Sequence, residues 1–87
     1  MPVVCLRGPL KRLADDRSEH VIEGASVDEL LRELERAHPA ASGWILDERG
    51  VLHGHINVFV NGARSAQDSP VGSDDRVDLL PAISGGQ

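Results

Sequence analysis

Cysteine and aromatic residues are scarce in this sequence, and their scarcity excludes several classes of protein. The 87 residues include one cysteine, Cys5, one phenylalanine, one tryptophan and no tyrosine. A lone cysteine cannot form a disulfide within the chain, and it cannot by itself hold an iron–sulfur cluster or a thiolate-bound zinc ion. The sequence is therefore neither a small ferredoxin nor a disulfide-rich secreted domain, and it suits a reducing compartment such as the cytoplasm.

Positive charge and long apolar runs are also scarce. Nine lysine and arginine residues are set against 14 aspartate and glutamate residues, which gives a formal net charge of −5. Because nucleic-acid binding needs a basic surface, this balance argues against DNA or RNA as a partner. No apolar run approaches the roughly 18 residues of a transmembrane helix, and no secretory signal pattern is present. We expect a single-domain cytoplasmic protein without a membrane or nucleic-acid partner.

One helix is predicted with clear start and stop signals. Ser26 and Glu29 form the Ser-x-x-Glu pattern of a capping box, so capping explains Ser26 better than a role as nucleophile. From Val27 onward, apolar residues recur at spacings of three and four, which gives the helix a single apolar face. Pro39 ends the helix, since the residue before a proline avoids the helical conformation.

Five short apolar or alternating runs predict the strands of a sheet under this helix. They are Val3–Leu6, Ser18–Glu23, Ile56–Val60, Ala63–Ser65 and Arg76–Leu80. The first two are expected to pair across a long flexible connection, and an Asn-Gly pair predicts a tight turn between the third and fourth. The first and last strands are the most continuously apolar, so we expect them side by side in the middle. One helix across a mixed sheet of four to five strands is an α+β architecture, and this element order is the β-grasp plan.

The segment between the helix and the third strand is less regular. Trp44, Ile45 and Leu46 are expected to enter the core as a short turn. His53 and His55 could project from one side, but two histidines without a third ligand are more typical of a solvated loop than of a metal site. We therefore expect no metal centre, and no set of catalytic side chains is visible.

The open face of the sheet carries the candidate contact residues. If alternate residues of the third strand face the helix, Phe59 faces away from it, and Leu80 does likewise if Leu79 points inward. With Ile83 nearby, these side chains would form an apolar docking patch beside the end of the chain. Pro81, which ends the last strand, is included in this predicted patch.

Three stretches together resemble the ubiquitin-like sulfur carrier proteins. They are VDELLRELERAHP, GVLHGHINVFVNG and DDRVDLLPAISGGQ, and the resemblance covers nearly the whole chain. The family includes the small subunit of molybdopterin synthase, the thiamin thiazole sulfur carrier and the cysteine-biosynthesis carrier. The second stretch is most similar to the molybdopterin and cysteine-biosynthesis types. The most specific feature is the Gly85-Gly86 pair near the end of the chain.

The resemblance implies a protein cosubstrate rather than an enzyme. It implies a β-grasp domain over residues 1–83 and a flexible tail over residues 84–87, in which Gly85 and Gly86 fit a narrow channel because they lack Cβ atoms. An ATP-using enzyme of the ubiquitin-activating type, both adenylyltransferase and sulfurtransferase, would adenylate the Gly86 carboxylate. Sulfur would then displace AMP to leave a thiocarboxylate for an acceptor synthase. The carrier itself would bind no cofactor, and the predicted patch would dock the partner enzyme.

One residue departs from the family pattern. Gln87 follows Gly86, so the resemblance implies a C-terminal peptidase that removes it before activation. Molybdopterin, cysteine and a secondary metabolite all stay open as the sulfur-containing product. Two other functions also stay open: a ubiquitin-like modifier joined to proteins through Gly86, and an interaction module with an inert tail.

Overall fold

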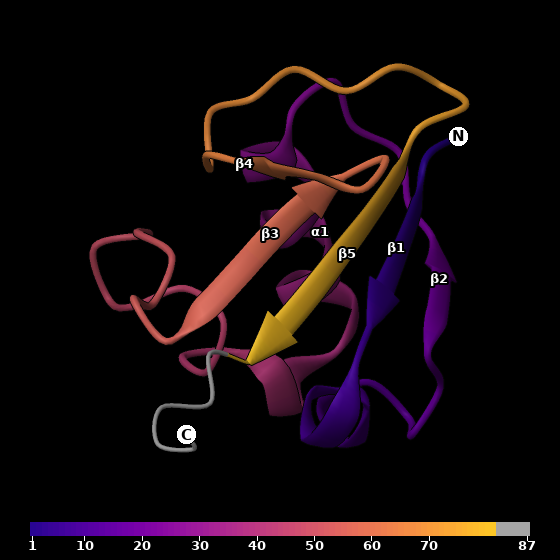
Figure 1. Cartoon of the computed structure of the whole chain (residues 1–87). Helices are drawn as coiled ribbons and strands as arrows, with labels where there is room; N and C mark the ends of the chain where they lie inside the picture. The colour runs from indigo at the N-terminus through magenta and orange to yellow at the C-terminus, as the bar shows by residue number, and fades with distance from the viewer. Residues whose placement is uncertain (82–87) are drawn as a thin grey trace.

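A five-stranded sheet with one main helix across it forms the part of the protein that the computed structural model describes, residues 1–81. The strands are β1 (Val3–Leu6), β2 (Glu19–Val21), β3 (Ile56–Val60), β4 (Ala63–Ser65) and β5 (Arg76–Pro81). Their order in the sheet is β2-β1-β5-β3-β4 (Figure 1). β1 and β5 are parallel neighbours at its centre, and the other pairs are antiparallel. The predicted α+β β-grasp plan and the central pairing are both confirmed.

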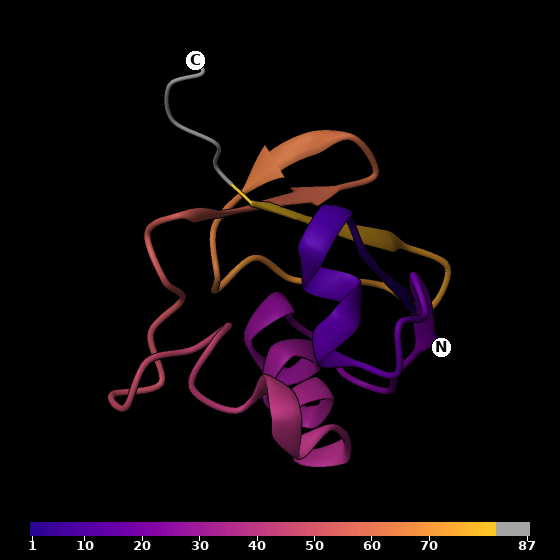
Figure 2. The ribbon, with the colours of Figure 1, turned by 90° about the horizontal axis from the view of Figure 1, so that it is seen from below.

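The helix α1 (Val27–Ala37) covers one face of the sheet (Figure 2). The side chains at this interface are fully or almost fully buried: Val4, Leu6, Ile56, Val58, Val77 and Leu79 from the sheet, and Val27, Leu30, Leu31 and Leu34 from the helix. Each such leucine contributes about 1.5–3 kcal/mol by its removal from water. The aliphatic core therefore supplies the burial that the scarce aromatic residues do not.

The predicted capping box is present with a small variation. The Ser26 hydroxyl accepts a hydrogen bond from the Glu29 N–H at 3.2 Å, as expected. The Glu29 carboxylate accepts the return bond from the N–H of Ala25, one residue before the cap, at 2.8 Å. The N–H groups of Ala25 and Glu29 have no backbone partner at the start of the helix, and these side-chain bonds satisfy both. No helix within residues 1–81 is long and apolar enough to cross a membrane.

The connection between β1 and β2 is not the flexible stretch that the sequence predicts. Residues Gly8–Leu13 form a 3₁₀ helix, η1, with Pro9 in its first turn. The side chain of Leu10 is buried and Leu13 packs partly against the core. Proline favours a helix start because its φ is already near the helical value. β2 is also shorter than the predicted strand 18–23, since it covers only Glu19–Val21.

The prediction that Trp44 enters the core is wrong. A second 3₁₀ turn, η2 (Pro39–Ala41), reverses the chain after α1, and the Trp44 N–H donates to the carbonyl of Ala41 at 2.9 Å. Ile45 and Leu46 fill the space beside α1, while the indole is 61% exposed. Two smaller aliphatic side chains suffice to close this side of the core, so the bulky ring stays outside.

The turn between β3 and β4 is formed by the predicted Asn-Gly pair. Asn61 and Gly62 have φ values of 51° and 87°, a left-handed conformation that these two residue types adopt most readily. The Asn61 side chain also accepts a hydrogen bond from the N–H of Arg76 at 2.9 Å and donates one to Asp75 at 2.9 Å. This turn therefore ties the end of β3 to the start of β5.

Two adjacent leucines of β5 provide a test of this sheet. Leu79 is fully buried against α1, whereas Leu80 lies half-buried on the other face. Leu79→Ala should lower the free energy of unfolding by about 2–5 kcal/mol, because it leaves a cavity in the core. Leu80→Ala, the matched control, should cost less than half as much in urea unfolding. Equal losses for the two variants would contradict the assigned register.

Candidate functional site

The open face of the sheet, on the side away from α1, brings two of the predicted contact residues together. Phe59 of β3 lies directly opposite Asp78 of β5, and Asn57 lies opposite Leu80. All four belong to the face away from the helix, because the alternate residues Val58 and Leu79 are buried against it. We call Asn57, Phe59, Asp78 and Leu80 the open-face patch. Phe59 and Leu80 are half-buried in it, so each presents part of an apolar side chain to solvent.

Pro81 does not belong to this patch. It lies opposite Ile56, whose side chain faces the helix layer. On that side it contacts the start of η1, where a Cβ added to Gly8 would lie 3.7 Å from the Pro81 Cγ. The reason is that successive side chains of a strand point to opposite faces of the sheet. The sequence prediction did not apply this alternation to Pro81. The predicted site residues Ile83, Gly85, Gly86 and Gln87, and the predicted boundary between residues 83 and 84, lie outside the described residues.

A network of ion pairs crosses the rest of the open face. Asp78 accepts a hydrogen bond from the guanidinium of Arg7 at 3.1 Å, and Arg76 lies 3.8 Å away from the same oxygen. Arg76 also pairs with Glu19 of β2 at 3.3 Å. Exposed pairs such as these contribute little stability one by one. Their effect is to place ordered charge on the open face between Phe59 and the β2 edge.

Cys5 lies beneath this network and is fully buried, although it is on the open face of β1. It stands in register with Asp78 on one side and Glu19 on the other. Burial raises the pKa of the Cys5 thiol, and the positive charge of Arg76 offsets this only in part. The thiol therefore stays protonated and covered, which makes it a poor nucleophile or sulfur acceptor.

The sequence reasoning missed this charged network. Its signal was present in the alternation of Arg76 and Asp78 with the apolar residues of the last strand. Because residues two apart share a face, both charges had to lie beside Leu80. The acidic partner Glu19 could not be found this way, since it comes from a strand whose register the sequence does not specify.

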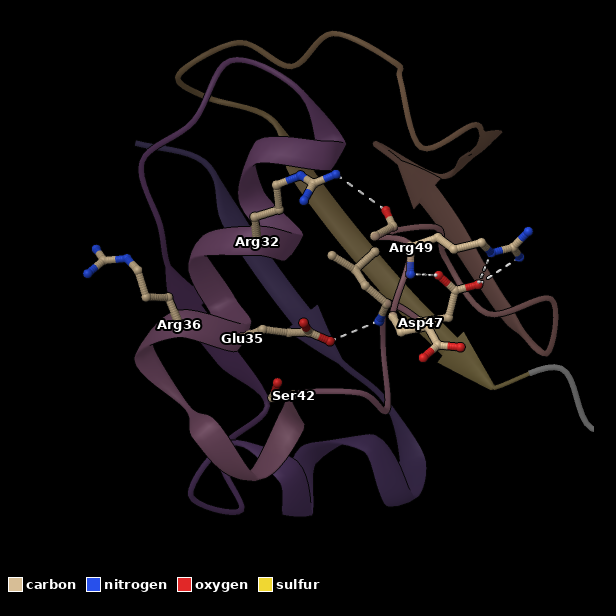
Figure 3. Close-up of a pocket in the computed structure, with 9 residues that line it drawn as sticks. Arg32, Glu35, Arg36, Ser42, Asp47 and Arg49 are labelled. Carbon is tan, nitrogen blue, oxygen red and sulfur yellow. Dashed lines mark hydrogen bonds and ion pairs between the residues drawn. The ribbon is translucent and has the colours of Figure 1, made fainter.

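A hollow lies on the helix side, between α1 and residues 42–50 (Figure 3). It has a volume of about 460 Å³ and a lining of mixed charge. The Glu35 carboxylate accepts a hydrogen bond from the N–H of Leu46 at 2.8 Å, and Arg32 donates to the Gly50 carbonyl at 3.4 Å. Its three arginines already pair with acidic side chains, at 2.9 Å or less. The hydrogen bonds of Glu35 and Arg32 hold the segment against the helix.

The two histidines of the following segment do not form a metal site with a third ligand. The rings of His53 and His55 have centroids 5.2 Å apart, and a ring nitrogen of His53 donates to the Gly43 carbonyl at 2.8 Å. Within residues 1–81, no group of three His, Cys, Asp or Glu side chains is placed to hold a metal ion. The hydrogen bond to Gly43 gives His53 a structural role in the loop.

Comparison with known protein families gives a match to nearly the whole chain: the family model described as the ThiS family matches residues 4–86. The chain belongs to the ThiS family. This match confirms the resemblance found in the sequence. The match includes both glycines of the Gly85-Gly86 pair and stops before Gln87.

Individual ThiS-family relatives have the same fold. Small archaeal modifier protein 1 of Haloferax volcanii is 35% identical over 79 residues, which cover 88% of this chain and 91% of that protein. Its crystal structure matches with a TM-score of 0.81 at 32% identity and covers 98% of both chains. A chain of the Amycolatopsis orientalis BexX/CysO complex matches with a TM-score of 0.86 at 26% identity, over 99% of this chain and 100% of that one. By its name, the curated relative is a protein modifier.

The carboxyl group of Asp47, in the loop that precedes β3, should titrate at unusually low pH. A hydrogen bond from the N–H of Val51 and others from Arg49 lower the pKa of Asp47 from its ordinary 3.8 to about 2. Because the folded-state pKa is the lower one, the stability that Asp47 contributes is complete above the ordinary pKa and is lost as the pH falls towards about 2.

Carbon-detected NMR of the Asp47 carboxylate should therefore show a midpoint near the lowered pKa. The difference in unfolding free energy between the native protein and Asp47→Asn should shrink as the pH falls through the same window. A midpoint of Asp47 at its ordinary value would contradict the hydrogen bonding described for this loop.

Proposed function

We propose that this ThiS-family protein is a sulfur carrier whose active group is the carboxylate of Gly86, exposed after removal of Gln87. The observation that carries the proposal is the family match itself, which runs through Gly85-Gly86 and leaves only Gln87 beyond it. A C-terminal peptidase would remove that residue. The carrier then acts as a protein cosubstrate of partner enzymes, and its described residues supply the surface that those enzymes bind.

The position of the open-face patch supports this reading. Leu80 of the patch is the second-to-last residue of β5, so the chain leaves the sheet immediately beside the patch. The five residues from 82 to 86 span at most about 17 Å when fully extended. An enzyme that binds Phe59 and Leu80 can therefore receive the carboxylate of Gly86 in an active site within that distance.

The proposed chemistry needs no catalytic group from the carrier. The Gly86 carboxylate attacks the α-phosphate of ATP on an activating enzyme of the ubiquitin-activating type, and pyrophosphate leaves. Sulfide then attacks the acyl carbon, and AMP leaves with the bonding electron pair. A persulfide of a sulfurtransferase attacks in the same way but gives an acyl disulfide, and a second thiol must cleave its S–S bond to release the thiocarboxylate. The thiocarboxylate that results donates its sulfur to an acceptor synthase. The carrier contributes a glycine end without side chains, which can enter a narrow site.

A ubiquitin-like modifier is the second candidate function, and one comparison favours it. At 35% identity, the curated relative reported above is a small archaeal modifier protein. In a modifier the same acyl-adenylate is attacked by a lysine amine of another protein, and an isopeptide bond replaces the thiocarboxylate. Conjugates of higher mass in the native cell extract would distinguish the modifier from the carrier.

Intact mass spectrometry of the protein from its native cells tests the carrier function. We expect a species that lacks Gln87 and has one oxygen replaced by sulfur. Gly86→Ala should unfold at the same denaturant concentration as the native chain, since the core of the described residues lies between Val4 and Leu79, yet form no thiocarboxylate. A chain that keeps Gln87 unchanged with activating enzyme, ATP and a sulfur donor present would overturn the proposal.

The docking surface can be tested separately with two apolar residues of the open face. Phe59→Ala should weaken binding to the activating enzyme by at least about tenfold, because a buried aromatic side chain is a common centre of binding energy. Val21→Ala is the matched control, since Val21 is 64% exposed on the same face at the distant β2 edge. The dissociation constant of the complex between the Val21→Ala variant and the activating enzyme, measured by calorimetry, should change less than about twofold. Similar losses of affinity for both variants would show that the activating enzyme binds another surface.

A further inference from the structure

One row of side chains crosses the open face over all five strands. Phe59 of β3 lies opposite Asp78 on one side and opposite Arg64 of β4 on the other. Asp78 is in register with Cys5 of β1, and Cys5 is in register with Glu19 of β2. Because residues in register across a sheet share a face, this row runs from an acidic residue at the β2 edge to a basic one at the β4 edge. Phe59 and Arg64 are neighbours at its β4 end.

The carboxylate and guanidinium groups of this face are paired with one another, except for one. Arg7, which follows β1, pairs with Asp78 at 3.1 Å, and Arg76 pairs with Glu19 at 3.3 Å. These two positive and two negative charges cancel. Arg64 is exposed, and within residues 1–81 its guanidinium takes part in no ion pair or hydrogen bond. It is therefore the charge that the described open face leaves without a partner.

The position of Arg64 exposes it to any partner that binds Phe59. Opposite residues on neighbouring antiparallel strands have Cα atoms about 4.5–5.5 Å apart. Since a stable protein interface buries about 800 Å² on each side, a partner that covers Phe59 also contacts Arg64. Removal of a charge from water is unfavourable unless an opposite charge meets it. The described residues of the chain itself offer Arg64 no such charge, so the partner has to supply it.

We infer that Arg64 is a specificity-determining residue for the activating enzyme, an inference that rests on the proposed docking at the open-face patch. The enzyme surface that fits has an apolar pocket for Phe59 and, beside that pocket, a carboxylate that pairs with Arg64. A guanidinium suits this role because its planar donors match the two oxygens of a carboxylate. The pair selects against proteins that offer an apolar pocket with a basic rim. Phe59 supplies the apolar contact, and Arg64 decides which apolar pocket is accepted.

A second copy of this chain is a poorer occupant of the same surface. The formal net charge of −5 makes two copies repel each other. The strand that carries Arg64, β4, is only three residues long, so it offers a second copy little backbone to pair with. Sedimentation equilibrium of the chain alone should therefore give the mass of a monomer.

Calorimetric binding to the activating enzyme tests the role of Arg64, with the full chain and with the chain that ends at Gly86. Arg64→Glu places a like charge against the enzyme carboxylate and should raise the dissociation constant at least about tenfold. Arg64→Lys keeps the positive charge and should raise it less than about fivefold. Unfolding curves of both variants should coincide with the native curve, because Arg64 is exposed on an outer strand.

Arg12→Glu is the matched control for the change of charge. Arg12 is exposed on η1, which lies at the far end of the sheet from β4 (Figure 1), and within residues 1–81 it takes part in no ion pair. The substitution changes the net charge by the same amount as Arg64→Glu. The dissociation constant of the Arg12→Glu complex should change less than about twofold, since a distant exposed charge is screened by salt.

The salt dependence of binding separates an ion pair from a loss of packing. Because salt screens exposed charges, the rise of the dissociation constant with NaCl concentration should be smaller for Arg64→Ala than for the native chain. Phe59→Ala removes apolar contact only, so its complex should be weaker but should keep the native salt dependence.

Two results would overturn the inference. One is an equal loss of affinity for Arg64→Glu and Arg12→Glu. The other is a dimer of the chain alone that Arg64→Glu dissociates, which would make a second copy the occupant. The proposed function is judged by a different readout, ATP–pyrophosphate exchange on the activating enzyme with the chain that ends at Gly86. Failure of exchange in the native sequence removes the carrier function, whereas exchange with an unchanged KM in Arg64→Glu removes only the role of Arg64.

Discussion

The parallel pairing of β1 with β5 is the interaction on which the rest of this structure depends. It joins segments separated by nearly the whole chain, Val3–Leu6 and Arg76–Leu79, and buries alternate residues of both under α1. A parallel pair cannot be closed by a tight turn, so everything between must cross over, and that crossover supplies the helix layer. The pairing also makes the two ends of the central strands chemically different. The carboxyl ends of β1 and β5 lie side by side at one end of the sheet, together with η1.

The last strand shows how one short segment serves two surfaces. Val77 and Leu79 are buried in the core, whereas Asp78 and Leu80 lie on the face that the proposed partner would contact. Since neighbouring residues point to opposite sides, the register with β3 determines both sets at once. A slip by one residue would bury Asp78 and expose Leu79. The stability of the fold and the composition of the docking surface are therefore not independent in this protein.

Local signals in the sequence were sufficient for the elements that rest on local physics. The helix start at Ser26, the turn at Asn61 and the placement of Phe59 and Leu80 all follow from capping, left-handed conformation and strand alternation. The exposure of Trp44 could not be predicted this way, because it depends on whether Ile45 and Leu46 already fill the core beside α1. The same holds for the ordered η1 and for the network over Cys5, which joins charges from β2 and β5 that only the tertiary fold brings together.

The two outer strands of the sheet have a consequence of their own. β2 and β4 are each three residues long, and both carry a charged side chain, Glu19 and Arg64. Short, charged outer strands are poor templates for the addition of another strand, and they oppose edge-to-edge aggregation. The proposed carrier would pass from one partner to the next and would have to release each of them readily. Recognition through side chains of the open face, rather than through a shared backbone ladder, suits such repeated exchange.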